Sequence, residues 1–201
     1  MSAIEQLLLR REFSYLPPLF YHHDFALRCE LGAGGAATRQ QIRTAERRAS
    51  EIYRILFPQG ADALFFHRLN FDSPLPGDKR QERFVRAFRR KYRCAVIPGL
   101  ETSELSAEGL ISRDRIICYA DGKRFNYKRL IRRLVRVDFG GAGALDTSFV
   151  SFENECVLSI YDDRGCDIVF ATKEKYRQFY PLLAQYLFAY DLEEMKRRFE
   201  E

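Results

Sequence analysis

The sequence predicts an α+β fold, in which an antiparallel or mixed sheet carries helices mainly on one face. Strand-like segments of alternating or β-branched residues share the chain with segments whose apolar residues recur at helical spacing. Three strand-like segments near the C-terminus follow one another with short connections, which favours an antiparallel meander over a regular β-α-β alternation. We expect one domain over residues 1–201, with the glycine-rich stretch at 140–143 as a candidate hinge.

The N-terminal part of the chain is predicted to alternate between helices and strands. The expected elements are a helix at 3–13, a strand at 25–31, a helix at 39–57 and a strand at 63–71. The strand at 25–31 alternates, so that Arg28 and Glu30 lie on a solvated face and Leu27 on a buried one. Thr38 is a suitable N-cap for the helix that follows.

The rest of the chain is predicted to contain basic amphipathic helices, a meander and two closing helices. The expected elements are a helix at 79–93, extended segments near 94–98 and 114–120, a helix at 126–137, strands at 147–153, 155–161 and 166–171, and helices at 173–189 and 191–200.

The segment at 155–171 is predicted to be a hairpin, because β-branched and aromatic residues flank a turn of two aspartates, an arginine and a glycine. We expect Tyr161 and Cys166 to flank a four-residue loop. The expected cross-strand pairs are Ser159 with Ile168 and Val157 with Phe170.

This hairpin contains the candidate site that the sequence indicates. Its residues are Tyr161, Asp162, Asp163, Arg164, Gly165 and Asp167. In a structural interpretation Asp162 caps the turn and Gly165 adopts a positive φ. Asp167 is then a partly buried acid, on the face of Ile160 and Val169, that meets an arginine or backbone amides. In a functional interpretation the carboxylates gather and bind a partner, a cation or a basic ligand.

The two basic helices offer a second candidate surface. Its residues are Arg86, Arg90, Arg129, Arg132, Arg133 and Arg136. Such a surface can bind phosphate groups, but the same pattern is typical of a solvated helix face. The net charge of +5 is compatible with nucleic acid or acidic partners without being diagnostic.

The stretch Gly32-Ala33-Gly34-Gly35-Ala36-Ala37 formally fits the dinucleotide-binding pattern, after a strand and before a helix. Arg28 and Glu30 indicate a half-solvated strand, however, and neither an acidic partner nor a Walker lysine follows. We therefore predict that the chain binds neither dinucleotides nor nucleoside triphosphates.

The five cysteines are an odd number, contain no C-x-x-C pair and lie mostly in apolar segments. We therefore expect them to act as small hydrophobic residues, without a disulfide framework or zinc ribbon, in a reducing compartment. No secretory signal pattern and no membrane span is visible, so we expect a cytoplasmic protein without membrane contact. We identify no catalytic residues, no metal ligands and no cofactor.

Four segments resemble a bacterial family, the domain of unknown function 3885 family. They are the strand and glycine at 25–32, the helix segment at 47–52, the Tyr161–Asp167 hairpin, and the closing aromatic helix with Tyr190-Asp191-Leu192. The resemblance covers nearly the whole chain. It implies no activity, and it marks the Tyr161–Asp167 hairpin as the most specific of the four.

These observations favour a non-enzymatic module that binds another protein, of a regulatory or toxin-antagonist type. One alternative is a cation-dependent hydrolase or transferase that uses Asp162, Asp163 and Asp167. A second alternative is nucleic-acid binding through the arginine-rich helices.

Overall fold

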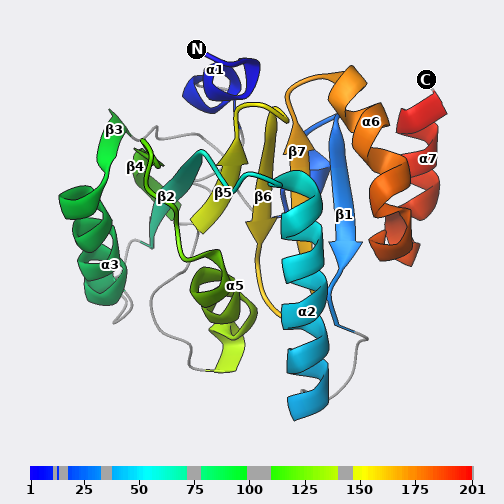
Figure 1. Ribbon diagram of the computed structural model, residues 1–201, viewed down its shortest axis with the longest axis horizontal. Helices are drawn as coiled ribbons and strands as arrows, with labels where there is room; N and C mark the ends of the chain where they lie inside the picture. Colours follow the sequence, from blue (N-terminus) through cyan, green and yellow to red (C-terminus); the bar gives the residue numbers. More distant parts are fainter. Residues whose placement is uncertain are drawn as a thin grey trace.

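One antiparallel sheet runs through the molecule (Figure 1), which confirms the predicted α+β class. The computed structural model describes residues 1–10, 13, 18–32, 38–71, 78–98, 110–139 and 147–200. Every strand pairing within these residues is antiparallel. In the order in which they lie across the sheet, the strands are β1 (Ala26–Glu30), β7 (Gly165–Phe170), β6 (Cys156–Ile160), β5 (Thr147–Ser151), β2 (Ala63–Phe71), β4 (Leu110–Tyr119) and β3 (Arg93–Pro98).

Most helices lie close to the predicted positions, but the expected helix at 3–13 is too long: it ends at Leu9, because the backbone of Arg10 is already extended. The α-helices are α1 (Ala3–Leu9), α2 (Arg39–Leu56), α3 (Asp78–Lys91), α5 (Tyr127–Val135), α6 (Lys173–Leu183) and α7 (Leu192–Glu200), and the 3₁₀ turns are η1 (Leu19–His22), η2 (Val137–Phe139), η3 (Ala184–Tyr186) and η4 (Ala189–Asp191). The expected helix at 173–189 is too long. The helix ends at Leu183, and four residues later Leu187 forms a β-bridge with Cys29 of β1, which a continued helix would not allow.

Helices α2, α5 and α6 cover one face of the sheet (Figure 1). Tyr53 of α2 packs edge-on against Phe149 of β5, with 5.0 Å between the ring centroids, and stacks on Tyr127 of α5. Phe179 of α6 stacks on Phe170 of β7 at 5.4 Å. The N-terminal elements lie on the other side, where η1 contacts the opposite face of β7 and β1. The sheet is therefore covered on both faces, with the long helices on one of them.

Local sequence signals determine where α2 begins and where β2 lies. The Thr38 hydroxyl accepts a hydrogen bond from the Gln41 amide at 3.2 Å, and the Gln41 side chain accepts one from the Thr38 amide at 2.7 Å. This capping box satisfies amides that the first helical turn leaves unpaired. The predicted strand at 63–71 is confirmed without change.

The predicted hairpin is present, but the register that we predicted for it is wrong by one residue. Ser159 lies opposite Asp167 and Val157 opposite Val169. The reason is that Tyr161 pairs with Gly165 and not with Cys166, so that only residues 162–164 lie between the paired residues. A shift of one residue exchanges the two faces of a strand. Asp167 therefore lies on the face of Ser159, and not on that of Ile160 as the sequence suggested.

A disulfide joins Cys94 of β3 to Cys118 of β4. The two residues lie directly opposite each other in the ladder, with 4.2 Å between their Cα atoms. The expectation that cysteines act only as small hydrophobic residues is wrong for this pair, since the pairing of β3 with β4 brings together two residues 24 positions apart. Cys29, Cys156 and Cys166 are free and buried.

Two of the predicted features lie outside the described residues. They are the glycine-rich stretch after Gly32, at 33–37, and the candidate hinge at 140–143. None of the helices in the described ranges has the length and apolar character that a membrane crossing needs.

Candidate binding site around Arg28

Arg28 lies on β1, at the edge of the sheet, opposite Asp167 of β7. The other side of β1 is bordered by the segment between α6 and α7. The Phe188 amide donates a hydrogen bond to the Arg28 carbonyl at 2.9 Å. Arg28 is therefore held between the β6–β7 hairpin and the C-terminal segment.

The Arg28 guanidinium binds four polar groups from three parts of the chain. Nη1 donates to the Tyr21 hydroxyl at 2.8 Å and to Asp191 Oδ2 at 3.2 Å. Nε donates to the Tyr161 hydroxyl at 3.4 Å and lies 3.7 Å from Asp167 Oδ1. One cation thus ties together η1, the hairpin and η4.

Three aromatic rings surround the same guanidinium. Its central carbon lies 5.1 Å from the ring centroid of Tyr21, 5.9 Å from that of Tyr161 and 5.6 Å from that of Phe188. The Arg28 side chain is only 16% exposed, so the predicted solvated face of β1 is wrong at this residue. Burial opposes the charge, but Tyr161 and Asp167 raise the pKa of Arg28 above its ordinary value.

Asp167 is the buried carboxylate of the site. Its Oδ2 accepts a hydrogen bond from the Phe20 amide at 3.1 Å. Its Oδ1 has no hydrogen-bond partner among the described residues and depends on the nearby charge of Arg28. Burial raises the pKa of Asp167 to about 6, against the opposing effects of the Phe20 amide and Arg28. The prediction that Asp167 meets an arginine or backbone amides is confirmed.

Asp162 holds the hairpin turn together, as the sequence predicts. Its Oδ1 accepts a hydrogen bond from the Arg164 amide at 2.7 Å, and its Oδ2 accepts one from Arg164 Nε at 2.8 Å. Asp163 is half-buried beside it, and burial followed by the charge of Asp162 raises the pKa of Asp163. Arg164 Nη2 lies 3.8 Å from Asp138, after α5.

Gly165 is required for a reason other than the predicted one. It has no positive φ; among the described glycines only Gly60 and Gly122 do. A Cβ at position 165 would overlap the Tyr161 hydroxyl and lie 2.8 Å from the carbonyl oxygen of Cys29. Glycine is therefore needed because β1 and Tyr161 approach the backbone closely.

A hollow of about 400 Å³ opens beside the guanidinium. It is lined by Pro18, Arg28, Tyr161, Asp162, Arg164 and Phe188. Two tyrosines near this hollow are largely exposed, Tyr21 at 54% and Tyr190 at 83%. The ring centroids of Tyr190 and Phe188 are 6.5 Å apart. Tyr21, Arg28, Phe188 and Tyr190, with the hollow, are called the Arg28 surface below.

Residues 6–191, which include all of these residues, match the family described as a domain of unknown function (DUF3885). The chain belongs to this family. No curated protein and no solved structure matches it.

The four segments that resembled the DUF3885 family in the sequence meet around β1. Within the DUF3885 domain Arg28 contacts Tyr161 and Asp167 of the hairpin and Asp191 of the C-terminal segment. The α2 segment approaches the end of the same strand, because Arg48 Nη1 lies 3.8 Å from Glu30 Oε2 and donates to the carbonyl of the next residue, Leu31, at 3.4 Å. Features that are dispersed along the sequence therefore form one continuous region.

The three aspartates of the DUF3885 hairpin do not gather into a cation site. Asp162 binds Arg164, whereas Asp167 points toward the Phe20 amide on the buried face. Within the described ranges, no three His, Cys, Asp or Glu side chains are grouped as metal ligands.

Five of the six predicted basic residues lie on two helices of the DUF3885 domain. Arg86 and Arg90 are on α3, and Arg129, Arg132 and Arg133 are on α5. Arg136, which follows α5, binds Glu46 of α2 at 2.6 Å. The two helices border a shared groove.

Sequence reasoning missed Tyr21, Phe188 and Asp191 as site residues and assigned Arg28 to a solvated face. The only signal was that the segments carrying Arg28, Phe188 and Asp191 took part in the family resemblance; no signal in the sequence pointed to Tyr21. Asp191 is 163 positions from Arg28, and no periodicity in the sequence connects residues so far apart.

Proposed function

We propose that this DUF3885 domain is a non-enzymatic module that binds another protein through the Arg28 surface. The observation that carries the proposal is an arginine, fixed by four polar contacts, next to two largely exposed tyrosines. Tyrosine and arginine are among the residues that contribute most to binding energy in protein interfaces.

Preorganisation of Arg28 supports this proposal. A long side chain that becomes ordered on binding costs about 0.5–1.5 kcal/mol of conformational entropy. Tyr21, Tyr161 and Asp191 already hold Arg28 in place, so a partner meets an ordered surface. The hollow beside Arg28 has room for a side chain of that partner.

The exposure of Tyr190 also supports the proposed binding role. The Tyr190 side chain is 83% exposed, although its ring centroid lies 6.5 Å from that of Phe188. A large aromatic side chain in water retains apolar area that a partner can bury. A regulatory or toxin-antagonist role in the bacterial cytoplasm is the setting that we propose for such a module.

The test is capture of binding proteins by the immobilised full chain from a nuclease-treated lysate of the source cell. Tyr190→Ala removes an exposed ring, and Leu182→Ala removes a 53% exposed apolar side chain of α6 as a matched control. We expect the wild type and Leu182→Ala to retain the same protein at high salt, and Tyr190→Ala to lose it. Equal capture by all three would contradict the proposal.

A further inference from the structure

Helices α3 and α5 border a groove toward the β3 end of the sheet, away from the Arg28 surface at the β1 edge (Figure 1). The groove has a volume of about 280 Å³. Its apolar lining comes from Phe88 and Tyr92 of the α3 side and from Leu130 of α5. Tyr92 and Leu130 are buried, so these side chains form a floor, while Phe88 is half-buried.

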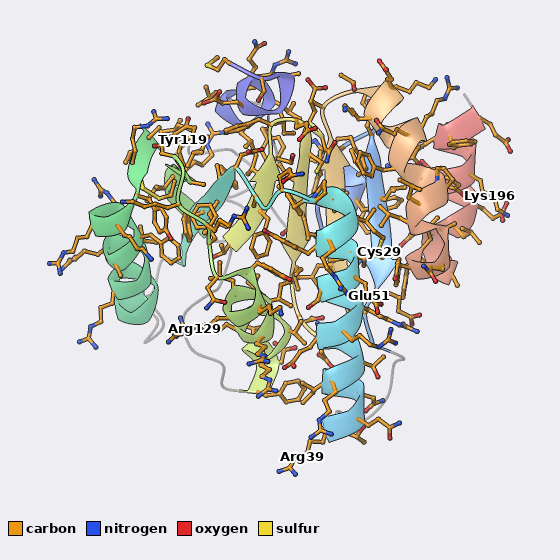
Figure 2. All side chains as sticks on the ribbon, in the orientation of Figure 1. Cys29, Arg39, Glu51, Tyr119, Arg129 and Lys196 are labelled. Atoms are coloured by element: carbon orange, nitrogen blue, oxygen red, sulfur yellow. A yellow bond between two sulfur atoms is a disulfide. The ribbon has the colours of Figure 1, made fainter. Side chains whose placement is uncertain are left out.

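The rim of this groove is basic. Lys91 stands on the α3 side, and Arg129 and Arg133 stand on the α5 side. Figure 2 shows Arg129 projecting from α5 on the side that faces α3. Among the described residues no acidic side chain lines the groove, and the sequence of α5 contains none.

Two cations of the rim, Lys91 and Arg129, are not neutralised by an ion pair among the described residues. Within the described part of the chain, Lys91 and Arg129 form no ion pair, and neither do Arg86, Arg90 and Arg132, which belong to the same helices but do not line the groove. Some arginines elsewhere are paired, as Arg136 is with Glu46 and Arg93 with Asp121. Unpaired charge of one sign around an apolar floor is complementary to a ligand that is both acidic and apolar.

The aromatic rings of the floor do not offer a stacking platform. Phe88 and Tyr92 stack on each other, with 5.4 Å between centroids, and Tyr92 also packs against Phe125 at 4.8 Å. The ring centroid of Phe66 of β2 lies 5.5 Å from that of Phe88. Single-stranded nucleic acid needs exposed ring faces on which its bases stack. The groove instead suits aliphatic side chains.

We propose that the α3–α5 groove binds an acidic amphipathic segment of a partner protein. Apolar side chains of that segment occupy the floor, and its carboxylates face Lys91, Arg129 and Arg133. This surface is separate from the Arg28 surface, so the proposal stands independently of the first one.

The experiment measures fluorescence anisotropy of a labelled peptide that carries leucine and glutamate at helical spacing, titrated with the full chain. A second peptide has serine in place of every leucine, and a labelled oligothymidylate represents single-stranded nucleic acid. We expect the leucine peptide to bind at least about tenfold more tightly than the serine peptide, since each tenfold step corresponds to about 1.4 kcal/mol.

The matched variants are Arg129→Glu and Arg39→Glu. Both residues are exposed in the first turn of a helix, but Arg39 lies at the start of α2, outside the groove (Figure 2). We expect Arg129→Glu to weaken binding of the leucine peptide about tenfold or more, and Arg39→Glu to change it less than about twofold. Tyr190→Ala should leave this binding unchanged.

Four results would overturn the proposal. The leucine peptide does not bind; the serine peptide binds equally well; both charge reversals weaken binding equally; or the oligothymidylate binds in preference to the leucine peptide. The last result would instead assign the basic helices to nucleic acid.

Discussion

Arg28 and Asp167 face each other across β1 and β7, with 3.7 Å between Nε and Oδ1. Asp167 is buried, and only one of its oxygens has a hydrogen-bond donor among the described residues. Because the attraction of Arg28 does not offset the burial of Asp167, the carboxyl has a pKa of about 6 in the folded protein.

This raised pKa predicts a pH dependence of stability. The folded state keeps the proton of Asp167 up to about pH 6, whereas an unfolded aspartate releases it near 3.8. The contribution of Asp167 to the free energy of unfolding therefore falls as the pH rises through this interval, by on the order of 3 kcal/mol. Asp167→Asn removes this titration. We expect the difference in unfolding free energy, wild type minus variant, to fall between about pH 4 and pH 6 in urea titrations; a difference independent of pH would contradict the account.

Asp162 and Asp163, the two aspartates of the turn, are a matched pair that tests whether these carboxylates stabilise the fold or serve binding. Asp162→Ala leaves the Arg164 amide without its acceptor and should lower the free energy of unfolding by about 1–3 kcal/mol. Asp163→Ala should cost much less, since Asp163 makes no side-chain hydrogen bond to another described residue. Thermal melts decide the matter. If both variants melt at or above the wild-type temperature, the carboxylates are crowded for binding and our structural interpretation is wrong.

Gly165→Ala should destabilise the protein through a steric clash, by about 1–3 kcal/mol. The new Cβ meets the Tyr161 hydroxyl and the Cys29 carbonyl oxygen. Tyr161→Phe removes the hydroxyl but leaves the carbonyl. In a double-mutant cycle we therefore expect Gly165→Ala to cost less in the Tyr161→Phe background than in the wild type. An equal cost in both backgrounds would mean that the hydroxyl contact is irrelevant.

Cysteine labelling tests the Cys94–Cys118 bond. When the protein is denatured without a reductant, we expect an alkylating reagent to modify three residues, Cys29, Cys156 and Cys166. After reduction it should modify all five cysteines of the chain. Mass spectrometry counts the adducts. Modification of five cysteines in rapidly quenched, unreduced cells would show that the bond does not form in the compartment where the protein acts.

Local sequence determined much of the secondary structure. The Thr38 capping box and the apolar periodicity behind it predict α2 from neighbouring residues alone, and β2 at 63–71 follows from its own composition. The hairpin at 155–171 is equally local, because its turn residues and strand residues are adjacent in the chain.

Only the tertiary structure decided the register of that hairpin and the composition of the site. Whether Gly165 belongs to the loop or to β7 depends on its contact with the Cys29 backbone of β1, which lies 136 positions earlier in the chain. The partners of Arg28 likewise come from positions 7 to 163 residues away. A pattern of alternation assigns Arg28 to the polar face of β1 but cannot show that η1, the hairpin and η4 cover that face. Burial of a charge depends on which distant segments pack together, and the pairing of β1 with β7 brings these segments to Arg28.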